Sequence, residues 1–173
     1  MNKEKEMSIS IIKVVALDVY GTILAFDDVD DSFPPRRGIE DFFDNCEERG
    51  IKVVTSSDGG TGNVKNDLSI SFKVAIERIA DPEERRKMKE RLSLKRFDDF
   101  FQLDQGTKDF SEIIGHYDII PSQLLVIGDN LNKDIYGAFR VGARAILCPI
   151  YGIDQGGDWD FGMIDLDNIE NAQ

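Results

Sequence analysis

Short apolar runs alternate along the chain with segments of helical periodicity. The apolar runs predict five strands, at residues 11–17, 51–54, 97–103, 124–127 and 143–147. Helical patterns fill the intervals, at about 39–49, 64–80, 81–94, 109–117 and 132–141. Strands and helices that alternate at this spacing favour a parallel, doubly wound sheet. We therefore expect an α/β fold, a Rossmann-like three-layer sandwich with a mainly parallel five-stranded sheet.

Two of the helical segments differ in how clearly the sequence defines them. Asp81 followed by Pro82 is a typical helix start, with an N-cap carboxylate and a proline in the first turn. The segment 64–80 is ambiguous, because its apolar residues partly alternate as in a strand, whereas Phe72 and Ile76 fit one face of a helix. The helical interpretation is favoured.

The chain length fits one domain. With 173 residues and 41% hydrophobic residues, the chain can bury a sizeable core. Residues 1–10 are charged and of mixed sign, and we expect them to form an N-terminal extension. Residues 11–173 are expected to form a single α/β domain, with a small helical insertion at about 62–95 and an irregular tail from about 151.

The charge balance limits the partners. Thirty-three acidic and 21 basic residues give a net charge of −12, which repels nucleic acid and anionic membranes within a Debye length of ~8–10 Å. No nucleic acid and no membrane is therefore expected as a partner. Two cysteines are too few for a disulfide framework, and no apolar stretch approaches the ~20 residues of a membrane span, so a cytoplasmic location is expected. The acidic loop at 27–31 is interpreted as a solvated turn, with a cation site as the alternative.

Three aspartates follow two of the predicted strands. Asp18 comes directly after the strand at 11–17, and Gly128-Asp129, with Asp134 five residues later, follows the strand at 124–127. Separately, such residues are also typical of strand-end turns and helix caps. Together they would repel one another at one edge of the sheet unless a cation lies between them, and Mg²⁺ with oxygen ligands is the usual solution.

Two further groups are candidates for phosphate binding. Lys108 is predicted near a helix N-terminus, where the helix dipole disfavours a cation, so it is a candidate for neutralising an acid or binding phosphate. A solvated lysine is the alternative. Thr55 or Ser56, after the strand at 51–54, offers a hydroxyl and backbone N–H groups to phosphate oxygens, although an ordinary turn has the same residues.

In their order along the chain, these motifs resemble the haloacid dehalogenase-like hydrolase superfamily. The resemblance covers residues 11 to 147 and rests on the segment Asp18-Val19-Tyr20-Gly21-Thr22, Thr55-Ser56, Lys108, and Gly128-Asp129 with Asp134. It implies that Asp18 is the nucleophile and a metal ligand, that Thr55 (or else Ser56) and Lys108 bind phosphate, and that Asp129 and Asp134 hold Mg²⁺. The implied reaction is phosphatase chemistry through an aspartyl-phosphate on Asp18.

Tyr20 departs from the pattern of the family. Phosphatases of the superfamily carry a second Asp at this position as general acid and base. A phenol, with a pKa of ~10, can donate a proton but accepts one poorly at neutral pH. Its backbone carbonyl can still serve as a metal ligand. Tyr20 is compatible with a slow phosphatase, with one that acts on good leaving groups, or with a catalytically weak binding or regulatory protein.

Tyrosine at this position also resembles the dehalogenase branch, in which Asp attacks carbon without a metal. Asp129 and Asp134 count against that branch, and the segment between Thr22 and Thr55 is too short for a helical cap that would exclude water. Without a full cap domain, the crevice stays open. An open crevice suits a macromolecular substrate, or closure by a neighbouring subunit of a homo-oligomer. The expected partner is a phosphorylated small molecule or protein substrate.

Overall fold

The computed structural model describes residues 12–104 and 106–169, so the expected extension at 1–10 and the first residue of the strand at 11–17 lie outside the described residues. A five-stranded, fully parallel sheet forms the centre, in the order β3-β2-β1-β4-β5. The strands are β1 (Val14–Leu17), β2 (Lys52–Ser57), β3 (Asp99–Gln102), β4 (Leu124–Gly128) and β5 (Arg144–Leu147). The helices are α2 (Ile39–Glu48), α3 (Thr61–Glu77), α4 (Pro82–Arg91), α5 (Ser111–Tyr117) and α6 (Tyr136–Val141).

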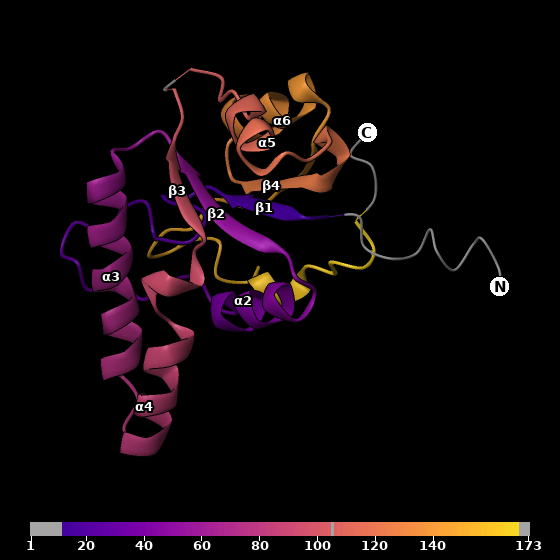
Figure 1. Cartoon of the computed structure of the whole chain (residues 1–173). Helices are drawn as coiled ribbons and strands as arrows, with labels where there is room; N and C mark the ends of the chain where they lie inside the picture. The colour runs from indigo at the N-terminus through magenta and orange to yellow at the C-terminus, as the bar shows by residue number, and fades with distance from the viewer. Residues whose placement is uncertain (1–11, 105, 170–173) are drawn as a thin grey trace, which may run out of the picture.

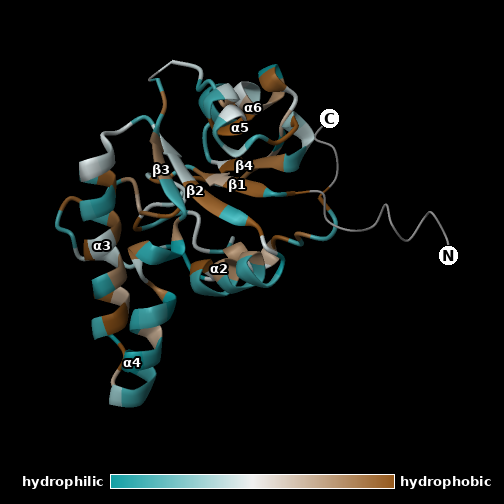
Figure 2. Cartoon of the chain, in the orientation of Figure 1, coloured by the Kyte–Doolittle hydropathy of each residue, from teal (hydrophilic) through white to brown (hydrophobic). Residues whose placement is uncertain are grey.

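The helices cover both faces of the sheet, as the sequence predicts for a Rossmann-like α/β fold (Figure 1). Alternate residues of β1 point to opposite faces. Val15 and Leu17 belong to the core shared with α2 and α3, while Val14 and Ala16 belong to the core shared with α5 and α6. A strand buried on both faces reads as a continuous apolar run, which explains why β1 was readily predicted. The apolar colour of β1 and β4 is visible in Figure 2.

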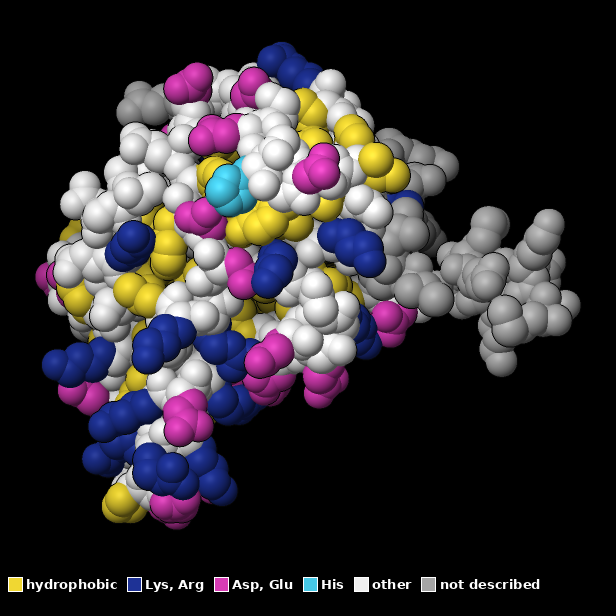
Figure 3. Space-filling view, viewed as in Figure 1, with side chains coloured by type: hydrophobic (Ala, Val, Ile, Leu, Met, Phe, Trp, Pro, Cys, Tyr) yellow, Lys and Arg dark blue, Asp and Glu magenta, His cyan; other side chains and the backbone are white. Residues whose placement is uncertain are grey.

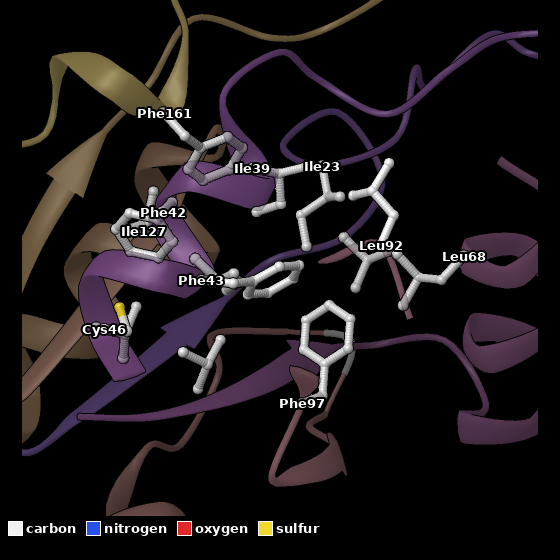
Figure 4. Packing of buried hydrophobic residues seen from close by; sticks show 14 of the residues in the cluster. Ile23, Ile39, Phe42, Phe43, Cys46, Leu68, Leu92, Phe97, Ile127 and Phe161 are labelled. Atoms are coloured by element: carbon white, nitrogen blue, oxygen red, sulfur yellow. The ribbon is translucent and has the colours of Figure 1, made fainter. Parts of the chain in front are cut away.

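Several phenylalanines pack against one another in the core beneath α2. Phe43 of α2 meets Phe97 edge to face, with 5.1 Å between ring centroids, and Phe42 contacts Phe161 of the C-terminal segment at 5.4 Å (Figure 4). Such tilted ring pairs contribute about 0.5–1.5 kcal/mol beyond the area they bury. Over its described residues, the C-terminal segment is irregular apart from a bridge between Gly152 and Gln155 and a short 3₁₀ turn at Phe161–Met163, and it closes this core.

The segment from 61 to 96 forms a helical hairpin that extends beyond the sheet (Figure 1). The ambiguous segment is helical, as favoured, and α3 buries Val64, Leu68, Phe72 and Ile76 on one side. The helix α4 begins where the sequence predicts, because the carboxylate of Asp81 accepts hydrogen bonds from the backbone N–H groups of Glu83 and Glu84. None of the helices in the described ranges is long and apolar enough to cross a membrane.

The second strand differs from its prediction. The polar cluster after Val54 was expected to end the strand, but β2 continues to Ser57. The reason is tertiary, because Thr55, Ser56 and Ser57 pair in register with residues 100–102 of β3. Pairing with β1 ends at Thr55, so pairing with β3 alone keeps Ser56 and Ser57 in the sheet despite their low apolar content.

Candidate active site

The three aspartates meet at the carboxyl edge of the sheet. β1 and β4 are neighbours, with Leu17 opposite Ile127, so Asp18 lies opposite Gly128 and Asp129 leaves the adjacent strand one residue further on. A π-helical turn at Leu131–Ile135 then directs Asp134 back toward β4. Carboxylate oxygens of Asp18, Asp129 and Asp134 lie within 4.8 Å of one another. This spacing of oxygen ligands is suited to a metal ion.

Two glycines allow the carboxylates to approach. Gly21 has a φ of +83°, and a Cβ atom at this position would lie 2.6 Å from Oδ2 of Asp129. A Cβ atom on Gly128 would lie 2.3 Å from Oδ2 of Asp134. The glycines therefore provide the space in which the aspartates converge.

Lys108 is the cation of the cluster. Its side chain is 2% exposed, and its Nζ donates hydrogen bonds to Oδ1 of Asp18 at 2.9 Å and to Oδ1 of Asp134 at 2.6 Å. Lys108 lies in the loop before α5, not inside a helix. Lys108 therefore forms direct ion pairs with Asp18 and Asp134, and the alternative of a solvated lysine is wrong.

The cluster carries excess negative charge. Burial raises the pKa of both Asp129 and Asp134, and the nearby carboxylate of Asp18 raises them further. Burial alone lowers the pKa of Lys108, but the attraction of Asp18 and Asp134 outweighs it and the pKa is raised overall. One ammonium group faces three carboxylates, so the cluster favours an additional cation.

Thr22 connects two of the acids. Its Oγ1 lies 3.2 Å from Oδ2 of Asp18 and 3.2 Å from Oδ1 of Asp129. The hydroxyl donates its single proton to one of these carboxylates at a time. Thr22 was quoted in the motif but received no role from the sequence.

A small cleft of about 110 Å³ opens onto the cluster. Five of the lining residues were site candidates from the sequence: Asp18, Tyr20, Lys108, Asp129 and Asp134. The other three, which the sequence analysis did not single out, are Asp58, Asn130 and Lys133. Lys133 and Asp58 form an ion pair of 2.8 Å across the cleft. Their positions offered a weak signal, since Asp58 follows β2 and Lys133 lies between Asp129 and Asp134.

Thr55 and Ser56 do not line this cleft. Both are buried within β2, and neither side-chain hydroxyl has a hydrogen-bond partner in the described part of the chain. Because β2 extends further than expected, Ser57 and Asp58 occupy the strand end, where Oγ of Ser57 accepts a hydrogen bond from the backbone N–H of Gly59 at 3.1 Å. The assignment of Thr55 or Ser56 to phosphate binding stays a prediction.

Tyr20 lines the cleft with its ring, but its hydroxyl is engaged elsewhere. It donates a short hydrogen bond to Oδ2 of Asp67 in α3. Burial, together with the hydrogen bond and the negative charge of Asp67, raises the pKa of Tyr20 well above its usual value. The phenol therefore remains protonated at neutral pH and is held by α3.

A buried arginine supports the loop that follows Asp18. Arg36 is 1% exposed, and its guanidinium donates to the carbonyl oxygens of Pro149 at 2.7 Å and Gly156 at 2.9 Å, and at 3.5 Å to that of Thr22. It also lies 4.5 Å from the centre of the Trp159 ring. Burial lowers the pKa of Arg36. Arg36 thus fixes the C-terminal segment against the active-site loop without a carboxylate partner.

Comparison with protein families supports the resemblance seen in the sequence. Residues 108–150 match a family model described as HAD-hydrolase-like, where HAD denotes haloacid dehalogenase. No curated protein matches the chain in sequence.

Solved structures show the same fold at low identity. The N-terminal part of a Bacteroides fragilis protein, which contains a phosphatase domain complexed with Mg, has a TM-score of 0.62 and 17% identity, over 95% of this chain and 44% of that one. A haloacid dehalogenase-like protein from Streptococcus pneumoniae has a TM-score of 0.58 and 10% identity, over 85% and 90%. CbbY from Rhodobacter sphaeroides, in complex with xylulose-(1,5)bisphosphate, has a TM-score of 0.58 and 13% identity, over 87% and 92%.

The match over residues 108–150 and the shared fold agree with the resemblance to the haloacid dehalogenase-like hydrolase superfamily that the sequence motifs carry.

Proposed function

We propose that this protein is a Mg²⁺-dependent phosphohydrolase that works through an aspartyl-phosphate on Asp18. The observation that carries the proposal is the position of Asp18 at the carboxyl end of a central parallel strand, bonded to Lys108 and grouped with two further carboxylates. Ligands of open α/β sheets bind at this edge.

The residues present fit a magnesium ion. Asp18, Asp129 and Asp134 supply hard oxygen ligands within 4.8 Å of one another, and together with Lys108 they retain a net negative charge. The backbone carbonyl of Tyr20 is the proposed fourth protein ligand, by resemblance to the family. A bound Mg²⁺ would screen the repulsion between the Asp18 carboxylate and a phosphoryl group. The Mg complex of the similar Bacteroides fragilis phosphatase domain supports this assignment.

The chain's own residues then perform two displacements. In the first, a carboxylate oxygen of Asp18 forms a bond to phosphorus while the bond to the leaving group breaks. Lys108, already bonded to Asp18, is placed to hold a phosphoryl oxygen and to offset its charge. In the second, water attacks phosphorus and releases phosphate and free Asp18. Thr55 or Ser56 is the proposed phosphate-binding hydroxyl, as the family resemblance implies.

Tyr20 limits the substrates that this site can turn over. Its hydroxyl donates its proton to Asp67 and its pKa is raised, so it is a poor proton donor to a leaving group and a poor proton acceptor from water. General acid and base assistance contributes ~10²–10⁴ in rate. We therefore expect slow turnover of alkyl phosphates and better turnover of acyl or aryl phosphates, whose leaving groups need no proton. The same observation favours a catalytically weak binding or regulatory protein as the second candidate.

The substrate is expected to be a phosphorylated small molecule or protein. Net charge of −12 disfavours nucleic acid, and the cleft of about 110 Å³ accommodates little more than a phosphoryl group. Carbon–halogen hydrolysis remains the less favoured alternative, because three clustered carboxylates would repel an incoming carboxylate substrate in the absence of a metal.

A substrate panel tests the proposal. Purified protein is assayed with p-nitrophenyl phosphate, acetyl phosphate and 2-chloropropionate, each with MgCl₂ and with EDTA. We expect phosphate release only with Mg²⁺, and its loss in Asp18→Asn. Asp154→Asn, an exposed residue of the C-terminal segment, is the matched control and should keep full activity.

Each other outcome has a defined meaning. Chloride release in EDTA would indicate the dehalogenase alternative. No release from any substrate, with Mg²⁺ shown to bind, would indicate the binding or regulatory alternative.

A further inference from the structure

A cavity much larger than the active-site cleft lies between α3 and α4. It has a volume of about 650 Å³ and shares no lining residue with the cleft. We call it the basic groove, and define it by its lining residues: Ser69, Phe72, Lys73, Ile76, Glu77, Arg85, Lys89, Leu92, Ser93, Leu94 and Lys95. Its size falls in the range of protein binding sites, ~300–1,000 Å³.

The groove combines an apolar floor with a cationic rim. Phe72 and Ile76 of α3 and Leu92 after α4 contribute apolar surface at the base and are each less than 9% exposed overall. The rim carries four cationic side chains and one carboxylate. Among the described residues, Arg85, Lys89 and Lys95 form no ion pair.

Neighbouring cations of the same hairpin are paired. Arg86 binds Glu83, Arg91 binds Asp44, and Arg96 binds Asp44 and Glu47. The unpaired cations are therefore a property of the groove and not of α4 as a whole. Burying three unpaired cations beside apolar surface costs free energy unless anions come with the ligand.

The hairpin has the opposite charge to the rest of the chain. Residues 61–96 contain ten basic and six acidic residues, which gives them a net charge of +4. Because the whole chain has a net charge of −12, the remaining residues have a net charge of −16. Lys and Arg side chains gather visibly on the extended end of the hairpin in Figure 3. An acidic surface of a second copy would be attracted to it over a distance set by the Debye length.

The chain itself carries a segment that matches the groove. The loop Phe26-Asp27-Asp28-Val29-Asp30-Asp31 has four carboxylates and two exposed apolar side chains, with Val29 88% and Phe26 49% exposed. Asp30 and Asp31 are exposed and form no ion pair in the described part of the chain. We call this segment the acidic loop.

The acidic loop has a defined conformation. Asp28 accepts hydrogen bonds from the backbone N–H groups of Ser32 and Phe33, both at 3.1 Å, and Asp27 accepts one from Ile153 at 2.9 Å. Ser71 of α3 donates to the carbonyl oxygen of Phe33, two residues after the loop, at 2.9 Å, which ties the end of the loop to α3. A preorganised loop loses little conformational entropy when it binds.

We propose that the basic groove binds the acidic loop of a second copy of this chain. Val29 enters the apolar floor, and Asp30 and Asp31 approach Arg85, Lys89 and Lys95. A nucleic acid is a less suitable ligand, because the net charge of −16 on the rest of the molecule would repel its phosphates. A membrane is also less suitable, because residues 61–96 have no large exposed apolar side chain that could insert into it. A loop in a groove buries less area than a standard interface, so the association is weak, with a Kd on the order of micromolar.

Sedimentation velocity of the full chain tests the proposal. We expect concentration-dependent association at low salt that weakens as salt is added. Val29→Ser, and separately the pair Lys89→Glu with Lys95→Glu, should weaken the association at least about tenfold. Arg86→Glu with Lys87→Glu, which changes cations of α4 outside the groove, is the matched control and should have a smaller effect.

A charge-exchange experiment separates the specific contact from general repulsion. The pair Asp30→Lys with Asp31→Lys, mixed with the Lys89→Glu, Lys95→Glu variant, should form a mixed dimer although each variant alone does not associate. Circular dichroism checks that every variant is folded. A wild-type chain that stays monomeric at millimolar concentration, or equal association of all variants, would overturn the proposal. So would tighter binding of single-stranded RNA or phosphatidylserine vesicles in a manner that depends on Lys89 and Lys95.

Discussion

Replacing Asp129 by Asn removes one charge from the acidic cluster with almost no change of shape. The asparagine oxygen can still accept the hydrogen bond from Thr22. In the metal-free protein, the variant relieves repulsion with Asp18 and Asp134. In the magnesium-bound protein, it removes a ligand. The substitution should therefore act in opposite directions in EDTA and in MgCl₂.

The structure indicates the size of the effect. Burial, with the neighbouring carboxylates, raises the pKa of Asp129 from 3.8 to about 7. A carboxyl whose pKa is raised by folding contributes stability below about pH 4, and this contribution is lost as the pH rises to about 7. If the whole pKa shift were converted to free energy of unfolding at 1.36 kcal/mol per pKa unit, it would amount to about 4 kcal/mol. Because this carboxyl is partly exposed, solvent screening reduces the expected contribution to about 1–2 kcal/mol.

Urea unfolding followed by the fluorescence of Trp159, the single tryptophan, measures the effect. In EDTA at pH 8, Asp129→Asn should be more stable than wild type by about 1–2 kcal/mol, and at pH 5 by much less, because Asp129 is then protonated. Magnesium at 100 times its Kd should stabilise wild type by about 2.7 kcal/mol and the variant by less. Asp154→Asn, the control of equal charge, should change none of these values by more than about 0.5 kcal/mol.

The reasoning would be refuted by a variant that is less stable than wild type in EDTA at pH 8, or that gains as much from Mg²⁺. The first result would mean that the aspartates do not repel one another, and the second that Asp129 is not a ligand.

Three further substitutions test other parts of the site. Tyr20→Asp should raise phosphatase turnover, by up to ~10²–10⁴, and no gain in a folded, metal-binding variant would contradict the role given to this position. Arg36→Met should lower the free energy of unfolding in urea by about 2–4 kcal/mol, because buried carbonyl oxygens lose their donor, whereas Arg37→Met, at an exposed position, should cost under about 1 kcal/mol. Equal costs would contradict the role of Arg36. Gly21→Ala should weaken magnesium binding, measured by calorimetry, because the added Cβ would displace Asp129. The control Gly50→Ala, with a similar φ but open space around it, should only lower the free energy of unfolding by about 1 kcal/mol. Unchanged magnesium affinity in Gly21→Ala would argue against this crowding.

Much of the fold follows from the sequence, because strands buried on both faces and amphipathic helices leave strong periodic signals. β1, β4 and α2 lie close to where the apolar pattern predicts them. The end of β2 was missed. Thr55–Ser57 are polar, and only their pairing with β3, more than forty residues away, makes them part of the sheet.

The site was partly predictable for the same reason. Asp18 and Asp129 follow directly from strands, and Asp134 lies on the π-helical turn after β4. The fold brings all three together with Lys108, as the motifs suggested. No local signal predicted the bond between Tyr20 and Asp67, since it depends on where α3 passes the loop after β1.

Arg36 was equally hidden from sequence analysis. A buried arginine is expected to have an acidic partner, but the guanidinium of this one donates to carbonyl oxygens of Pro149 and Gly156 and lies against an aromatic ring. Backbone carbonyls carry no sequence signature, so the contact could only be found from the structure.

The contacts of Arg36 have a consequence for synthesis of the chain. A ribosome delivers residues 12–37 long before residues 149–159. Arg36 can therefore reach the carbonyl oxygens of Pro149 and Gly156, and Gly21 can accept the backbone hydrogen bond from Tyr151, only after that later segment has been made. The nascent chain can form its first strands and helices early. Asp18 should therefore acquire a settled environment only after residues 149–159 have been synthesised, so the proposed reaction could not begin before that segment exists.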